Sequence, residues 1–222
     1  MATKTGSSFR LSAIPVALFA HLVAIAVTTL VLVWLLHFRR GLAFKSNDKQ
    51  KILNLHVLLM IIGFVTIAGE AITTFKTIPG SRNTQKLVHL TLHFIALLAG
   101  ILGIYTIFKF RNEIGNPHIV SLHSWIGLST VSLFGVQWLF GFFSWWPRAE
   151  MGARAKLAPW HVFFGIVILF MAILSAGMGL VERFILLGLQ RSQEALIVNF
   201  TGLLILLFGI FVGLAVILPR RY

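Results

Sequence analysis

Residues 87–108 read LVHLTLHFIALLAGILGIYTIF and contain no Asp, Glu, Lys or Arg. A helix needs about 20 consecutive apolar residues to cross the hydrocarbon core of a bilayer, so this stretch is long enough to span a membrane. Two histidines, His89 and His93, lie within it. Ionisable side chains inside a membrane span are rare and usually functional. The stretch therefore predicts a transmembrane helix that carries part of a functional site.

The chain as a whole has the same apolar character. Of its 222 residues, 58% are hydrophobic and 11% are charged, and the mean hydropathy is +0.91. A soluble domain has roughly 25% charged residues, so this composition places the protein in a membrane. Runs of spanning length occur at residues 11–36, 52–75, 87–108, 120–143, 157–181 and 195–219. We predict an all-α integral membrane protein of six transmembrane helices, forming one domain over residues 1–222.

An even number of spans puts both termini on one membrane face, which we call side A; the opposite face is side B. Lys and Arg divide ten to side A and nine to side B, so the positive-inside rule does not decide the orientation. Basic residues at helix ends that contact anionic lipid explain the net charge of +13. No basic helix or aromatic-interleaved basic patch indicates a nucleic-acid partner. The absence of cysteine excludes disulfides, thiolate-ligated iron–sulfur clusters and haem attached through C-x-x-C-H.

Four histidines lie at matched depths in consecutive spans. His56 and His123 lie near the side B starts of the second and fourth spans. His89 and His161 open the third and fifth spans at side A. Two imidazoles from different helices suit axial ligation of haem b, whereas zinc or copper would need further protein ligands. The two pairs would lie roughly 20 Å apart in a core of about 30 Å, which indicates an electron path across the bilayer.

Other interpretations of these histidines stay open. Four histidines hydrogen-bonded between helices would be structural, and a proton relay would fit a histidine-dependent proton or metal transporter without haem. A structural membrane scaffold is a third possibility. A reducible chromophore would distinguish the redox protein from both. His93 lies one turn, about 6 Å, deeper than His89, and we expect it to lie between the two haem levels as a packing residue.

The remaining ionisable groups carry weaker expectations. His21 has no partner at its depth in the first span, so we expect a hydrogen-bonded packing role. Glu70, near the side A end of the second span, should pair with a nearby base or be neutral, and we prefer a structural ion pair or helix-end position to a role in proton transfer. His118, in the side B loop after Pro117, would either be solvated or contact an electron acceptor.

Glycine follows two of the histidines at the same spacing. His123 with Gly127, and His161 with Gly165, are i, i+4 pairs that share one helix face. A glycine there lets a backbone or a flat ligand approach closely, although small residues also serve plain helix packing. The pattern alone does not choose between a ligand and a neighbouring helix.

Side A gathers positive charge around the openings of the third and fifth spans. Its two loops contain Lys76, Arg82, Lys86, Arg154 and Lys156. Lys86 comes shortly before His89, in an i, i+3 relation. A cationic rim above a buried redox site would raise the local concentration of a small anion. Anchoring to lipid head groups is the alternative explanation for these charges.

The stretch Ser121-Leu122-His123-Ser124-Trp125, together with the spacing of the four histidines and the six spans, resembles the cytochrome b561 family. Its members are ascorbate-dependent electron-transfer proteins with two haems, and the resemblance covers about residues 20–219. It implies a core of helices two to five around two non-covalent, bis-histidine haem b groups. The implied ligand pairs are His56 with His123 and His89 with His161, which leaves His93 a non-ligand. A homodimer and a cytoplasmic side A, with both termini cytoplasmic, are also implied.

The resemblance further implies an oxidoreductase that moves electrons across the membrane. Cytoplasmic ascorbate would give electrons through the two haems to monodehydroascorbate or a ferric chelate on side B. Lys86 and Arg154 are the expected catalytic residues, and Lys76 and Arg82 would help them bind ascorbate. His118 would contact the acceptor. The sequence departs from the family at Val120, where a tyrosine commonly precedes SLHSW.

Overall fold

The computed structural model describes residues 12–145 and 151–219, and the side chains of all of these except residues 151–154. These residues form helices and connecting loops, with no strand. α1 (Ala13–Val33) continues as the π-helix η1 (Trp34–Phe38), and α2 (Gln50–Leu58), the π-helix η2 (Leu59–Thr66) and α3 (Ile67–Thr77) form one continuous rod. The other helices are α4 (Arg82–Glu113), α5 (Leu122–Trp145), α6 (Met151–Leu186) and α7 (Gln193–Ile217).

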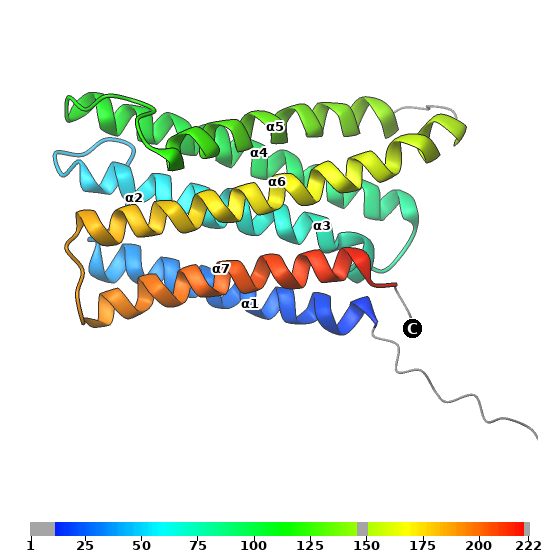
Figure 1. Cartoon of the computed structure of the whole chain (residues 1–222), viewed down its shortest axis with the longest axis horizontal. Helices are drawn as coiled ribbons and strands as arrows, with labels where there is room; N and C mark the ends of the chain where they lie inside the picture. The colour runs from blue at the N-terminus through cyan, green and yellow to red at the C-terminus, as the bar shows by residue number, and fades with distance from the viewer. Residues whose placement is uncertain (1–11, 146–150, 220–222) are drawn as a thin grey trace, which may run out of the picture.

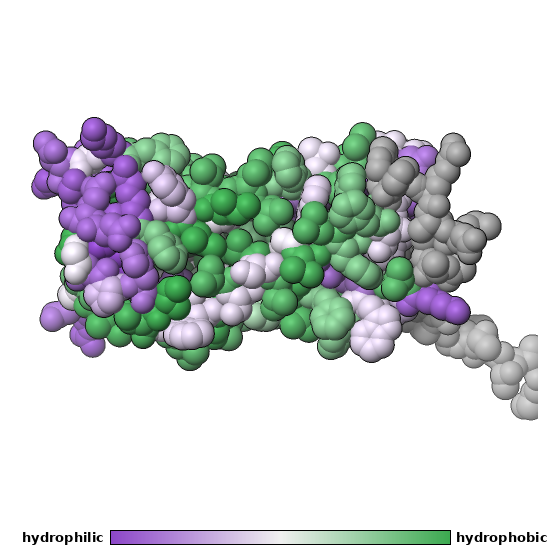
Figure 2. All heavy atoms as spheres, turned by 90° about the horizontal axis from the view of Figure 1, so that it is seen from above, coloured by the Kyte–Doolittle hydropathy of each residue, from purple (hydrophilic) through white to green (hydrophobic). Residues whose placement is uncertain are grey.

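The prediction of an all-α protein with six transmembrane helices is confirmed. Within the described residues, six helical segments are long and apolar enough to cross a membrane. Figure 2 shows the matching surface, in which apolar residues form a broad belt and polar residues gather toward the ends of the bundle. The protein is therefore an integral, multi-pass membrane protein.

The helices run up and down, so the loops alternate between the two ends of the bundle (Figure 1). The loops after η1, α4 and α6 lie at one end, which is side B. The α3–α4 connection and both ends of the described chain lie at the other end, side A. There the backbone N–H of Ala13 donates to the carbonyl of Pro219 at 3.0 Å. Both ends of the described chain therefore lie on the same face, as the even number of spans requires.

The outer helices α1 and α7 pack along one another and against the α2–α3 rod. At side B their ends are joined by Glu194, which accepts hydrogen bonds from the Arg39 guanidinium and, at 2.8 Å, from Trp34 Nε1. Asn54 on α2 donates to the Arg39 and Gly41 carbonyls, each at 2.9 Å. Trp34 and Asn54 are both fully buried. This cluster holds the ends of three helices together.

An ion pair connects α1 to α3 within the bilayer region. Nδ1 of His21 lies 2.5 Å from Oε2 of Glu70, and each side chain is less than one-third exposed. The expectation that His21 has no partner at its depth is therefore wrong, because the approach of two helices is not visible in either one's sequence. Glu70 pairs with a base, which favours the ion-pair interpretation of its charge.

The second span contains a π-helix at Leu59–Thr66. The Thr66 hydroxyl donates to the Ile61 carbonyl, an i to i−5 contact, at 2.9 Å. A π-helical turn holds one residue more than an α-helical turn, so residues beyond it are rotated relative to those before it. This rotation changes which residues of α3 face α4.

Candidate cofactor-binding sites

The bundle brings the four depth-matched histidines into two facing pairs. The ring centres of His56 on α2 and His123 on α5 are 6.4 Å apart. Those of His89 on α4 and His161 on α6 are 6.3 Å apart. An imidazole nitrogen lies about 2 Å from a bound metal and about 1.2 Å from its own ring centre, so two imidazoles on one metal have centres about 6.4 Å apart. Both pairs therefore have the spacing of two axial ligands.

Hydrogen bonds to Nδ1 hold three of these imidazoles in a defined state. Their Nδ1 atoms each lie 2.9 Å from a backbone carbonyl oxygen: His56 from Gly103, His89 from Ala71 and His123 from Ser175. A carbonyl can only accept, so Nδ1 carries the proton and Nε2 keeps its lone pair. A neutral histidine that binds a metal through Nε2 is in this state.

The acceptors follow a regular spacing along the helices. His89 and Gly103 stand in an i, i+14 relation on α4, and His161 and Ser175 stand in the same relation on α6. On each of these helices, the residue about four turns after the histidine contacts the histidine of an antiparallel neighbouring helix. His56 and Ala71 are instead an i, i+15 pair, and the π-helix η2 lies between them. Because the π-helical turn contains one extra residue, the position fifteen residues after His56 faces the neighbouring helix in the same way as the i+14 positions do on the other helices.

His161 completes the set with a side chain instead of a carbonyl. The i+14 position counted from His123 is Gln137, and its Nε2 lies 3.0 Å from His161 Nδ1. Sequence reasoning missed Gln137 and the three carbonyls. The constant i, i+14 relation between a histidine and the position that faces its neighbour was the signal that could have found them.

Glycines make these contacts possible. Gly127 and Gly165 face the residues that hold the histidines: a Cβ on Gly127 would lie 3.0 Å from Ser175 Oγ, and one on Gly165 would lie 3.8 Å from Gln137 Nε2. The His–Gly spacing therefore serves helix packing. Two other glycines face the rings, since a Cβ on Gly179 would lie 2.8 Å from His123 Cε1 and one on Gly141 would lie 3.2 Å from His161 Cε1.

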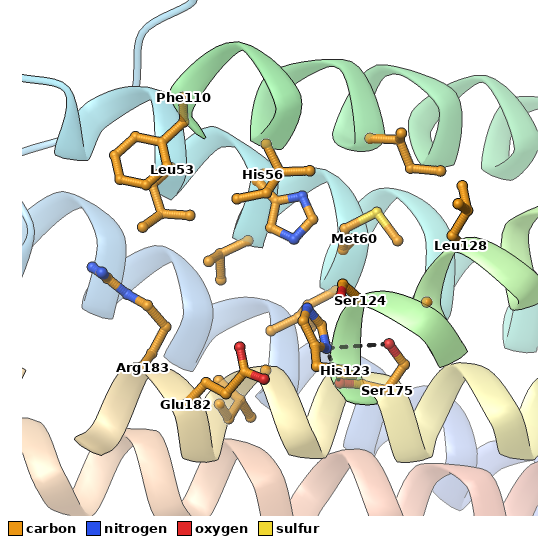
Figure 3. Close-up of a pocket in the computed structure, with 18 of the residues that line it drawn as sticks. Leu53, His56, Met60, Phe110, His123, Ser124, Leu128, Ser175, Glu182 and Arg183 are labelled. Carbon is orange, nitrogen blue, oxygen red and sulfur yellow. Dashed lines mark hydrogen bonds between the residues drawn. The ribbon is translucent and has the colours of Figure 1, made fainter. Parts of the chain in front are cut away.

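A cavity of about 210 Å³ surrounds the side B pair. Figure 3 shows His56 and His123 approaching it from different helices, with Arg183 projecting from α6 near its mouth. The Arg183 side chain is buried, and its Nε and Nη2 have no hydrogen-bond partner among the described residues. Its Nη1 donates to Gln50 Oε1 at 3.1 Å, so two buried donor nitrogens remain that an anion would satisfy. A carboxylate of a bound cofactor, such as a haem propionate, would supply that anion.

The loop over the side B cavity holds His118 in place. Its ring stacks on Phe108 with centres 4.5 Å apart, and its Nε2 lies 2.7 Å from Asn112 Oδ1. Arg111 braces the loop by donating to the Pro117 carbonyl at 2.6 Å. His118 therefore packs against α4 and lines the cavity, instead of extending into solvent.

A larger cavity, of about 560 Å³, surrounds the side A pair. Three of the predicted basic residues line it: Lys76, Arg82 and Lys86. Lys76 also donates to the Leu218 carbonyl at 2.7 Å, and the Arg82 guanidinium lies 5.4 Å from the centre of the Phe75 ring. Lys156 is exposed and is not part of the lining. Arg154 is in the first turn of α6, and its side chain lies outside the described residues.

His93 lies in the side A cavity beside His89, with ring centres 4.4 Å apart. Its ring also packs edge-on against Phe134, and its Nδ1 is buried without a hydrogen-bond partner among the described residues.

Phe64 and Ala172 line both cavities, so a wall one side chain thick separates them. Within the described part of the chain, no group of three or more His, Asp or Glu side chains could hold a metal ion.

A six-helix membrane bundle with two facing histidine pairs, each beside its own cavity, suits a transmembrane protein that binds flat cofactors between its helices. Residues 55–187 match the family model for eukaryotic cytochrome b561. The chain belongs to the cytochrome b561 family, as the SLHSW stretch and histidine spacing predicted.

Its relatives include plant and animal proteins. A probable ascorbate-specific transmembrane electron transporter of Oryza sativa subsp. japonica is 44% identical over 94% of this chain and 92% of the relative. A transmembrane ascorbate ferrireductase of Arabidopsis thaliana is 40% identical over 92% of this chain and 88% of the relative. A transmembrane ascorbate-dependent reductase of Mus musculus is 32% identical over 87% and 79%, respectively.

Proposed function

We propose that this protein transfers electrons across its membrane from ascorbate at side A to an acceptor at side B. It is an oxidoreductase, and the names of its plant and animal relatives support ascorbate as the electron donor. The observation that carries the proposal is the pairing of histidines across the bundle, at ring distances of 6.4 and 6.3 Å, with Nδ1 engaged in hydrogen bonds.

Two haem b groups are the proposed cofactors. His56 and His123 would hold one at side B, and His89 with His161 would hold the other at side A. When bound, the haems supply iron that alternates between the ferric and ferrous states, one electron at a time. The carbonyls at Nδ1 fix the imidazole planes and raise their basicity as ligands. Arg183 would neutralise a propionate at side B.

The basic lining of the side A cavity suits an anionic electron donor. Ascorbate is an anion at neutral pH, and Arg82, Lys86 and Arg154 would attract and orient it beside His89. In each transfer the ascorbate monoanion loses one electron to the protein and one proton to water and becomes monodehydroascorbate. Side A is then the cytoplasmic face, and both termini are cytoplasmic.

The side B loop would receive the acceptor. His118 lines the cavity of the His56–His123 pair and is held in place by Phe108 and Asn112. There monodehydroascorbate would take up one electron and one proton to give ascorbate, or a ferric chelate would take up one electron to give the ferrous ion. A homodimer embedded in lipid, as family resemblance implies, is the proposed assembly.

A visible spectrum of the purified protein, before and after adding ascorbate, tests this function. We expect ferric haem bands that change to ferrous bands, at two haems per chain. Replacing His89 and His161 together by Ala should remove one haem, whereas His37→Ala should remove neither because His37 lines neither cavity. Protein without a haem chromophore, or unchanged haem content in the double variant, would contradict the mechanism. Uptake driven by a proton or metal gradient without a chromophore would indicate a transporter.

A further inference from the structure

Gln137 distinguishes the side A histidine pair from the side B pair. Three of the four paired imidazoles have Nδ1 on a backbone carbonyl, which cannot turn and always accepts. Nδ1 of His161 alone among them faces a side-chain amide, which has an accepting end and a donating end. At the equivalent position on α6, Ser175 contacts His123 Nδ1 through its backbone carbonyl at 2.9 Å and through its hydroxyl at 3.3 Å, as the dashed lines in Figure 3 show.

The amide of Gln137 presents its donating end to His161. Its Nε2 donates to the carbonyl oxygen of His161 at 2.7 Å and lies 3.0 Å from Nδ1 of the same residue. An amide NH₂ cannot accept a hydrogen bond, so Nδ1 must be the acceptor in this arrangement. The ring proton is then on Nε2, and that nitrogen has no lone pair for a metal.

A half-turn of the amide reverses this state. It would place Oε1 at Nδ1, so that Nδ1 carries the proton and Nε2 becomes free to bind iron. The amide must also shift away from the His161 carbonyl, because two acceptor oxygens cannot stay 2.7 Å apart; that carbonyl lies within α6 and still accepts the backbone hydrogen bond of the helix. Gly165 leaves room for the movement, because even a Cβ built there would remain 3.8 Å from Gln137 Nε2.

We propose that Gln137 is the positioning residue of the side A centre: its amide turns to accept the His161 Nδ1 proton, and its strength as an acceptor sets that centre's reduction potential independently of side B. This inference rests on the proposed haem centres. A stronger acceptor at Nδ1 makes the imidazole more electron-donating, which favours ferric over ferrous iron and lowers the potential. A missing acceptor has the opposite effect.

Redox titration of the haem-loaded protein, followed by visible absorption and by the ferric EPR signal, tests the proposal. Gln137→Glu supplies a carboxylate acceptor and should lower the side A potential. Gln137→Met has a similar shape without an acceptor and should raise it. We expect roughly tenfold changes in the reduction equilibrium, or about 59 mV for one electron, in opposite directions. The side B potential should stay unchanged in both variants.

Ser132→Ala is the matched control, because the exposed Ser132 hydroxyl, also on α5, donates to the Leu128 carbonyl and lines neither cavity. It should leave both potentials unchanged. Shifts of the same sign in Gln137→Glu and Gln137→Met, or no shift in either, would overturn the proposal and indicate a packing role. If Gln137→Met loses the side A haem, Gln137→Glu alone decides by the direction of its shift. Wild-type protein without haem would instead refute the proposed function.

Discussion

His89 and His93 are neighbours on α4 with different surroundings. Nδ1 of His89 lies 2.9 Å from the Ala71 carbonyl, whereas Nδ1 of His93 is buried without a partner among the described residues. His89 also faces His161 across the cavity, while His93 packs against Phe134. This geometry supports His89 as the proposed ligand and a packing position for His93.

Lys86 provides a test of the proposed donor site at the scale of one residue. It lines the side A cavity, whereas Lys156 is exposed and lies outside the lining. Lys86→Ala should slow reduction by ascorbate about tenfold at low ionic strength, and less in high salt, because it removes a charge that attracts the anion. Stopped-flow measurement of haem reduction checks this.

Lys156→Ala is the control for that measurement, and it should change the rate little although it removes the same charge. Equal effects of the two substitutions would show that only the overall charge of side A matters. An unchanged rate in Lys86→Ala, with both haems retained, would place the donor elsewhere.

The paired histidines could be predicted from the sequence because span parity fixes which helix starts share a membrane face. Gln137 was missed although its i, i+14 relation to His123 is present in the sequence, since an amide in an apolar helix is equally compatible with interhelical packing. The partners of His21 and Glu70 were also out of reach, because the contact between α1 and α3 depends on how the helices pack.

Among the helical elements, the π-helix η2 could not be predicted from the sequence. Residues 59–66 read LMIIGFVT, an apolar run that an ordinary α-helix would accommodate equally well. Its effect becomes visible only when the i, i+15 relation of His56 to Ala71 is compared with the i, i+14 relation of His89 to Gly103. The π-helix thus aligns the Ala71 carbonyl with His89.

The α5–α6 pair offers a matched pair of glycine substitutions. A Cβ on Gly179 would lie 2.8 Å from His123 Cε1, whereas one on Gly177 would meet nothing within 4 Å. Gly179→Ala should displace the His123 ring and weaken retention of the side B haem roughly 10–100-fold. Haem content after dilution or competition with an apo-haem acceptor protein measures the loss.

Gly177→Ala should keep both haems and raise thermal stability slightly, because alanine favours a helix over glycine by about 1 kcal/mol. Haem loss in both variants would point to a general intolerance of α6 to substitution. Full haem retention in Gly179→Ala would show that the ring does not need the space that this glycine leaves.

For the whole molecule, hydropathy alone predicted the number of helices and the shared face of the termini. The order in which the helices pack was not predictable, because an apolar helix can bury any face against its neighbours. The cluster of Arg39, Trp34 and Glu194 illustrates the limit, since its charged partners come from opposite ends of the sequence.

That cluster should contribute measurably to the stability of the bundle. Glu194→Ala leaves Arg39 without its carboxylate partner, and the side chains of the pair are only 21% and 12% exposed. Losing one partner of a buried ion pair costs about 3–5 kcal/mol. We expect the thermal unfolding midpoint in detergent to fall, with the helices α1 and α7 exchanging amide hydrogens faster.

Glu113→Ala is the comparison for this effect. Glu113 pairs with Lys49 at 2.7 Å and with Lys109 at 3.5 Å nearer the surface, where an ion pair contributes about 1 kcal/mol or less. A smaller loss in Glu194→Ala than in Glu113→Ala would mean that the side B cluster does not hold the outer helices in place.

The hydrogen bond between Ala13 and Pro219 makes the described chain nearly a closed ring. A chain trimmed near these residues and cyclised by a short peptide linker would need little rearrangement of α1 or α7. Closure would reduce the conformational freedom of the unfolded chain. A head-to-tail cyclic form should therefore resist both heat and exopeptidases better than the linear protein.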